Sequence, residues 1–124
     1  MNALIDGLRE ARASPHPAGP VRVVETHISW VLLTGEFAYK IKKPLKLGFL
    51  DYSTLALRKR FCEEELRVNR RYAPELYLDV VAITASADGP EIGGAGKVIE
   101  YAVRMRQFPD DALLADVVAR ADPG

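Results

Sequence analysis

The sequence predicts one α+β domain, in which a mostly antiparallel five-stranded sheet is crossed by one long helix. Two stretches rich in β-branched and aromatic residues, 21–42 and 76–108, flank a run of helix formers at 53–73. Turn signals at Thr34-Gly35 and Asp88-Gly89 divide the two stretches into strands. With 124 residues, 48% of them hydrophobic, the chain can build one sizeable core.

A short helix is expected at residues 2–12, with an apolar face made of Leu4, Ile5, Leu8 and Ala11. The segment SPHPAGP at 14–20 breaks this helix, because three of its seven residues are prolines. The expected organisation is therefore a helix with its tether, a folded lobe and a final helix, at residues 1–20, 21–108 and 109–124.

The first half of the lobe should hold three strands, at about 21–26, 29–34 and 36–42. Pro44 ends the third strand, and residues 45–53 are expected to form a connecting loop. Either Asp51 or Ser53 can cap the helix that follows, which stops before Pro74.

Two more strands are expected at 76–86 and 97–108, joined by the Gly-rich linker ADGPEIGGAG. After Pro109, two aspartates stand at the favourable end of a helix. This segment, 109–124, is predicted to be a helix.

The composition argues against several classes of protein. Seventeen basic and seventeen acidic residues cancel, so neither nucleic acid nor a membrane is an expected partner. A lone Cys62 with His16 and His27 allows no internal disulfide and no zinc cluster. The first residues do not resemble a signal peptide, and a cytoplasmic location is expected. Residues 36–60 carry a local basic surplus that would attract an anionic ligand.

Lys40 is the first candidate for a functional side chain. Alternation along the strand places Phe37, Tyr39 and Ile41 on one face, and Ala38, Lys40 and Lys42 on the other. Small Ala38 opens space beside the Lys40 ammonium group. A second interpretation stays open, in which the lysine stem covers the sheet and its ammonium group reaches water.

Glu65 is the second candidate, because helical periodicity places it inside the apolar stripe. That stripe is expected to comprise Phe61, Cys62, Glu65, Leu66, Val68, Asn69, Tyr72 and Ala73. A buried carboxylate requires a cationic partner, and Lys40 is a natural one. The alternative is that Glu65 lies at the edge of the stripe and reaches solvent. The segments LRKR at 57–60 and NRR at 69–71 are interpreted as solvated helix surface.

These residues resemble a known family. A strand with Ala-x-Lys, a helix with an inward Glu, and then two strands and a hinge resemble the N-terminal lobe of the protein-kinase-like fold. The sequence over about 21–118 is most similar to bacterial proteins in which an aminoglycoside phosphotransferase is fused to a P-loop ATP-binding domain.

The resemblance implies a role for each matching residue. Lys40 would hold the α and β phosphates of ATP, and Glu65 would position Lys40. Ala38 would lie against adenine, and Ser29 would lie in the loop that covers the phosphates. Met105 would lie at the back of the adenine pocket. Backbone groups that bind the adenine edge would come from Arg106, Gln107 and Phe108.

The resemblance is incomplete. Residues 25–30 hold no glycine, unlike the phosphate-covering loop of protein kinases. No catalytic-loop or magnesium-binding motif occurs in the sequence, and the fold takes both from its second lobe. The chain is therefore expected to bind ATP, with Mg²⁺ and the small-molecule acceptor held by a second lobe, and not to catalyse phosphoryl transfer alone.

A rival interpretation is a non-catalytic interaction module, with the lysines as surface charge. On this interpretation the exposed lobe surface is expected to pair two copies as a homodimer. Three single residues have plain structural interpretations: His27 as an exposed or structural residue, Cys62 as a small core residue, and Trp30 as a packing residue.

Overall fold

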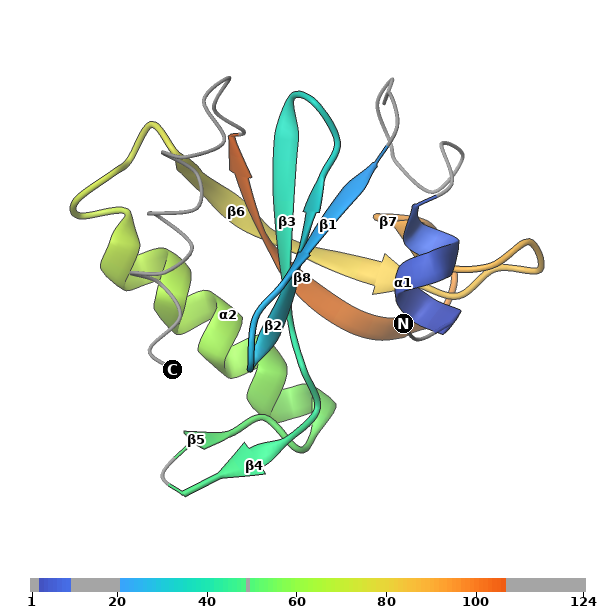
Figure 1. The fold of residues 1–124 in the computed structure, drawn as a ribbon, viewed down its shortest axis with the longest axis horizontal. Helices are drawn as coiled ribbons and strands as arrows, with labels where there is room; N and C mark the ends of the chain where they lie inside the picture. The colour runs from blue at the N-terminus through green and yellow to red at the C-terminus, as the bar shows by residue number, and fades with distance from the viewer. Residues whose placement is uncertain (1–2, 10–20, 49, 107–124) are drawn as a thin grey trace.

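A computed structural model describes residues 3–9, 21–48 and 50–106 of the chain. One main helix, α2, packs on a curled, half-barrel sheet, and the short helix α1 lies at the other side (Figure 1). The helices are α1 (Ala3–Leu8) and α2 (Leu55–Asn69). The strands are β1 (Arg22–Glu25), β2 (Ser29–Leu33), β3 (Phe37–Lys42), β4 (Lys46–Leu47), β5 (Leu50–Asp51), β6 (Tyr77–Thr84), β7 (Glu91–Ile92) and β8 (Val98–Arg106).

The α+β class and the antiparallel sheet are confirmed, but the number of strands is not five. The main sheet has six strands in the order β1-β2-β3-β8-β6-β7, and all of its pairings are antiparallel. The added strand is β7, which pairs with Ile83 and Thr84 from within the expected Gly-rich linker. A two-residue strand is too short to show alternation in the sequence, which explains the error. The expected helix at 109–124 lies outside the described residues.

The connection after β3 is a second correction. Residues 45–53, expected as a loop, include a small hairpin in which Lys46 pairs with Asp51. Gly48 takes a left-handed φ of 52° at its tip, a conformation that glycine adopts without strain.

The first face of the sheet is covered by α1. Ile5 and Leu8 are fully buried there against Tyr39, Ile41 and other apolar residues of the sheet. The expected α1 face is therefore confirmed at these two positions, and Trp30 is a packing residue of the same core. Burial of this apolar surface holds α1 on the lobe.

The second face of the sheet packs against α2. Its core comprises Val31, Leu33, Ala38, Cys62, Leu76, Tyr77, Val103 and Met105. The predicted alternation along β3 is confirmed, because Tyr39 and Ile41 belong to the first face and Ala38 to the second. Lys40 and Lys42 therefore point into the interface between the sheet and α2.

The apolar stripe of α2 is shorter than expected. The helix ends at Asn69, and hydrogen-bonded turns follow before Pro74. Tyr72 is 83% exposed and Val68 is 38% exposed, so both predictions of inward packing are wrong. Pro74 disfavours helical backbone at the residue before it, Ala73. The helix already ends at Asn69, four residues before Ala73.

The helix cap also differs from the prediction. Thr54 is the N-cap of α2, and its side-chain oxygen accepts a hydrogen bond from the Leu57 N–H at 3.1 Å. The carboxylate of Asp51 instead accepts hydrogen bonds from the backbone and hydroxyl of Ser53.

We expect Thr54→Ala to lower the free energy of unfolding by about 1 kcal/mol, because the Leu57 N–H loses its partner. Ser53→Ala, the matched control, should cost less than about 0.5 kcal/mol, as is usual for surface positions. Urea unfolding of the two variants checks this. Equal losses would contradict the assignment of the cap.

Candidate functional site

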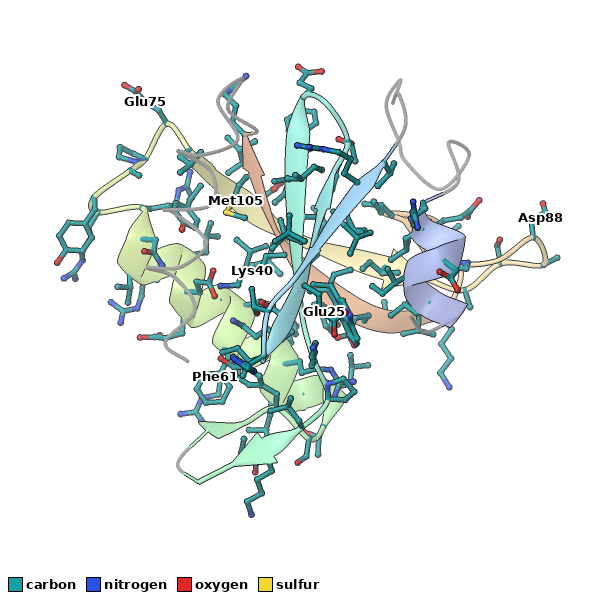
Figure 2. The ribbon with its side chains drawn as sticks, viewed as in Figure 1. Glu25, Lys40, Phe61, Glu75, Asp88 and Met105 are labelled. Atoms are coloured by element: carbon teal, nitrogen blue, oxygen red, sulfur yellow. The ribbon has the colours of Figure 1, made fainter. Side chains whose placement is uncertain are left out.

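The site begins with Lys40 in the centre of the sheet. Its strand β3 is paired on both sides, with Val31 of β2 and Val103 of β8 opposite Lys40. The Lys40 side chain has no exposed surface. The interpretation in which its ammonium group reaches water is therefore wrong, and Figure 2 shows Lys40 between the sheet and α2.

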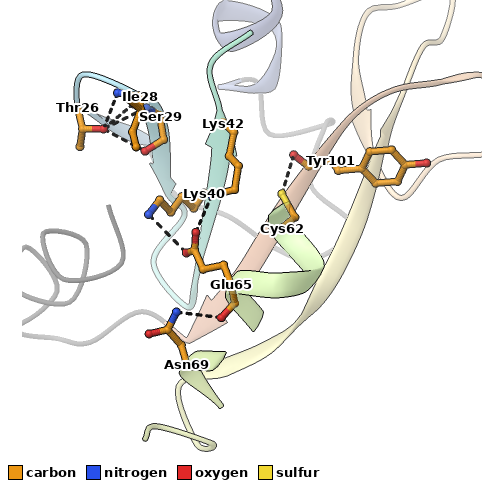
Figure 3. Close-up of polar contacts among 9 residues, drawn as sticks. All are labelled: Thr26, Ile28, Ser29, Lys40, Lys42, Cys62, Glu65, Asn69 and Tyr101. Atoms are coloured by element: carbon orange, nitrogen blue, oxygen red, sulfur yellow. Dashed lines mark hydrogen bonds and ion pairs between the residues drawn. The ribbon is translucent and has the colours of Figure 1, made fainter. Parts of the chain in front are cut away.

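Glu65 reaches Lys40 from α2. Its carboxylate oxygen Oε2 lies 3.4 Å from Lys40 Nζ, and its side chain is only 7% exposed. Figure 3 shows this carboxylate pointing from the helix toward the lysines of β3. The predicted meeting of the strand lysine and the helix glutamate is confirmed, and the alternative of a solvated Glu65 is wrong.

Lys42 is a partner that the sequence analysis missed. Its Nζ donates a hydrogen bond to Glu65 Oε1 at 2.6 Å, a shorter contact than the one from Lys40. Burial acts to lower the pKa of Lys42, but the adjacent Glu65 carboxylate outweighs it, so the pKa is raised and Lys42 is charged at neutral pH. The signal was available, since strand alternation places Lys42 on the same face as Lys40.

Tyr52 and Cys62 close the site around Lys42. The Lys42 ammonium lies 4.9 Å from the centre of the Tyr52 ring, within the range of a cation–π contact. Phe61 packs edge-on against the same ring. Cys62 is completely buried, which confirms its interpretation as a small core residue.

Burial raises the pKa of the Cys62 thiol to about 12. The group is then a neutral thiol at pH 8, and the thiolate is the reactive form. We expect an aromatic disulfide reagent at pH 8 to modify Cys62 of the folded protein at least about a hundredfold more slowly than in 8 M urea. Similar rates in the two conditions would show that this interface opens readily.

Ser29 is the first residue of β2 and directly follows the turn from β1. Ser29 is fully buried and pairs with Lys42 across the strands. Thr26 Oγ1 accepts hydrogen bonds from the N–H groups of Ile28 and Ser29 and lies 3.0 Å from Ser29 Oγ (Figure 3). This threonine turn fixes a loop that has no glycine. It also occupies two backbone donors that would otherwise be available to a phosphate.

The residues expected around adenine are partly brought together. Ala38 and Met105 are direct cross-strand neighbours on the α2 face, and both are buried. The Arg106 N–H donates to the Leu76 carbonyl oxygen at 2.8 Å, so this donor is already used by the fold. Gln107 and Phe108, the other expected backbone contacts, lie outside the described residues.

A second buried ion pair corrects the interpretation of the LRKR segment. Arg58 is 9% exposed and donates through Nε to both carboxylate oxygens of Glu100, at 2.9 and 3.0 Å. Its Nη1 also donates to the Tyr52 carbonyl oxygen. Arg58 lies four residues before Cys62 and seven before Glu65, and this helical spacing was the signal for its burial.

Other chemistry is absent from the described part of the chain. His27 is exposed in the β1–β2 turn. Residues 3–9, 21–48 and 50–106 contain no group of three or more His, Cys, Asp or Glu side chains that could hold a metal ion. Within the same ranges, neither helix has the length and apolar character needed to span a bilayer.

Similar proteins occur in mycobacteria. The chain is 36% identical over 103 residues to the uncharacterized protein Rv2004c of Mycobacterium tuberculosis and to the uncharacterized protein Mb2027c of Mycobacterium bovis. The match covers 83% of this chain and 19% of each relative, so the chain spans about a fifth of the length of the curated relatives it matches. No protein-family model matches the chain, and no solved structure matches it significantly.

Proposed function

We propose that this chain is the ATP-binding N-terminal lobe of a small-molecule phosphotransferase with a kinase-like fold. The observation that carries the proposal is the contact between Lys40 and Glu65, two buried charges from different elements. A buried ion pair is rarely a device for stability, because desolvation offsets most of its attraction. Buried charges paired between two elements of the fold are frequent at functional sites.

The arrangement suits phosphoryl groups. Lys40 lies on a central strand, and Glu65 on α2 orients the Lys40 side chain. A lysine held by a glutamate in this way can bind the α and β phosphates of a nucleotide. The interface between the sheet and α2 holds Lys40, Lys42 and Arg58 against Glu65 and Glu100, three cations and two anions among the described residues. An anionic ligand is therefore favoured electrostatically over a neutral one.

The neighbourhood of the pair also suits a purine. Ala38 lies two residues before Lys40 on the same face, where its small side chain is buried in the core under α2. Met105 lies opposite Ala38 and supplies an apolar, polarisable back wall. We assign Ala38 and Met105 to the adenine end and Lys40 to the phosphate end of the site.

The complete protein would transfer the γ-phosphoryl group of Mg-ATP to a hydroxyl of a small molecule. The described residues supply no metal site, so the Mg²⁺ ligands and the base would come from elsewhere in the protein. The chain covers about a fifth of its mycobacterial relatives, and proteins of that length have room for such a second lobe.

Titration of the complete protein with ATP and with adenosine tests the proposal. ATP should bind at least about tenfold more tightly than adenosine, because the phosphates contact Lys40. Lack of ATP binding up to millimolar concentration would refute the proposed function.

The rival function is a protein-interaction module, and the observation that favours it is the exposure of Tyr72, since tyrosines are enriched at interfaces. The rival treated the β3 lysines as surface charge, and the burial of Lys40 and Lys42 supports the nucleotide site instead. Light scattering at micromolar concentration would detect the homodimer that the rival predicts.

A further inference from the structure

Lys42 is the feature of the site that the proposed function does not yet use. It lies two residues after Lys40 on β3, opposite Ser29, and its side chain is 3% exposed. A second buried lysine is costly to maintain, because removing an ammonium group from water is unfavourable without close compensation. Glu65 supplies that compensation at 2.6 Å.

The two oxygens of Glu65 divide between the two lysines. Oε1 accepts the short, charge-assisted hydrogen bond from Lys42, whereas Oε2 lies 3.4 Å from Lys40. A contact of 2.6 Å is among the shortest for such a pair, and 3.4 Å is beyond the usual range of a charged hydrogen bond. Lys42 is therefore the tighter partner of Glu65, and Lys40 is the looser one.

This division matters when a phosphate approaches Lys40. If Glu65 had only Lys40 as its partner, moving the ammonium toward a phosphate would leave a buried carboxylate without compensation, which is strongly unfavourable. With Lys42 in place, Glu65 keeps one cation throughout. The Tyr52 ring, 4.9 Å from the Lys42 ammonium, holds that cation in position.

We propose that Lys42 is a positioning residue that anchors Glu65, so that Lys40 can exchange its carboxylate contact for the phosphates of a nucleotide. The inference rests on the proposed function and deepens it. Lys42 acts through Glu65 and does not touch the nucleotide. A structural role for Lys42 would predict instead a general loss of stability with no selective effect on phosphate binding.

The experiment compares ATP and adenosine as ligands of the complete protein. Lys42→Met, similar in length and neutral, should raise the Kd for ATP by roughly tenfold and leave the Kd for adenosine within about twofold. Lys46→Met removes an exposed charge from the same basic segment and is the matched control, with both affinities unchanged. A Lys42→Met variant that shifts ATP and adenosine equally, or shifts neither, would overturn the inference.

A double-mutant cycle with Glu65 separates the anchor from a general charge effect. In a Glu65→Gln background, Lys42→Met should change the Kd for ATP by less than about threefold, because no carboxylate remains to be anchored. An effect as large as in the wild type would overturn the inference. Lys42→Gln, which also removes the positive charge beside Glu65, is the second variant if Lys42→Met does not fold, and it carries the same expectation.

The two proposals fail differently. Absence of ATP binding by the wild type refutes the proposed function, and the role of Lys42 falls with it. ATP binding by the wild type with an unchanged Lys42→Met variant refutes only the anchoring role.

Discussion

Replacing Lys40 with methionine should lower the ATP turnover of the complete protein by at least about a hundredfold, or about 3 kcal/mol of transition-state stabilisation. The reason is that Lys40 is the only one of the two buried lysines whose contact with Glu65 is loose enough to be exchanged for a phosphate. Methionine keeps the length of the side chain, so the effect reports the lost charge and not a large cavity.

Lys46→Met is the control for this prediction, because it removes one exposed positive charge six residues away. Its turnover should stay within about twofold of the wild type, since exposed charges are screened by salt. A Lys40→Met protein that remains folded and retains its turnover would favour the interaction module over the kinase.

Arg58→Met should be strongly destabilising, lowering the free energy of unfolding by about 3–5 kcal/mol. The change leaves the Glu100 carboxylate, whose side chain is 5% exposed, without its bidentate partner. Arg60→Met, two residues further along α2 and exposed, should change stability by less than about 0.5 kcal/mol. Urea unfolding at pH 7 measures both.

The loss of stability caused by Arg58→Met should become smaller as the pH falls. Burial raises the pKa of Glu100, although Arg58 and the Tyr101 N–H partly oppose it. A raised pKa in the folded state means that ionisation costs stability, and loss of Arg58 raises the pKa further. The destabilisation by Arg58→Met should therefore shrink between pH 8 and pH 5, as Glu100 takes up a proton.

A double variant tests whether the unpaired, buried Glu100 carboxylate causes the loss of stability. Arg58→Met combined with Glu100→Gln removes the buried charge and keeps an acceptor for the Tyr101 N–H. It should recover most of the lost stability, because replacing both members of a buried pair is often nearly neutral. A double variant that is less stable than Arg58→Met alone would contradict the role assigned to the pair.

Much of the fold and the central contact could be predicted from periodicity. Alternation along β3 assigned Lys40 and Tyr39 to opposite faces, and the helical period of α2 turned Glu65 inward. Both patterns depend on local geometry only. They fail where an element is too short to repeat, as in β7, or where a helix ends early, as it does before Tyr72.

The pairing of charges was harder to predict. Whether Lys40 or Lys42 lies closer to Glu65 depends on how far α2 slides along β3, which no local pattern specifies. Arg58 and Glu100 are 42 residues apart in the sequence, and their contact exists only once α2 packs against β8. The burial of Arg58 could still be predicted, because it lies four residues before Cys62 and seven before Glu65, on the same face of the helix.

The measurement that most directly tests the central claim uses an acyl phosphate derivative of ATP as a label for the complete protein. This reagent transfers its acyl group to a lysine beside the bound phosphates, with release of ATP, and mass spectrometry locates the new amide. Lys40 should be the modified residue in the lobe, and excess ATP should suppress the reaction. Labelling of Lys46 alone, or labelling of Lys40 that ATP does not suppress, would contradict it.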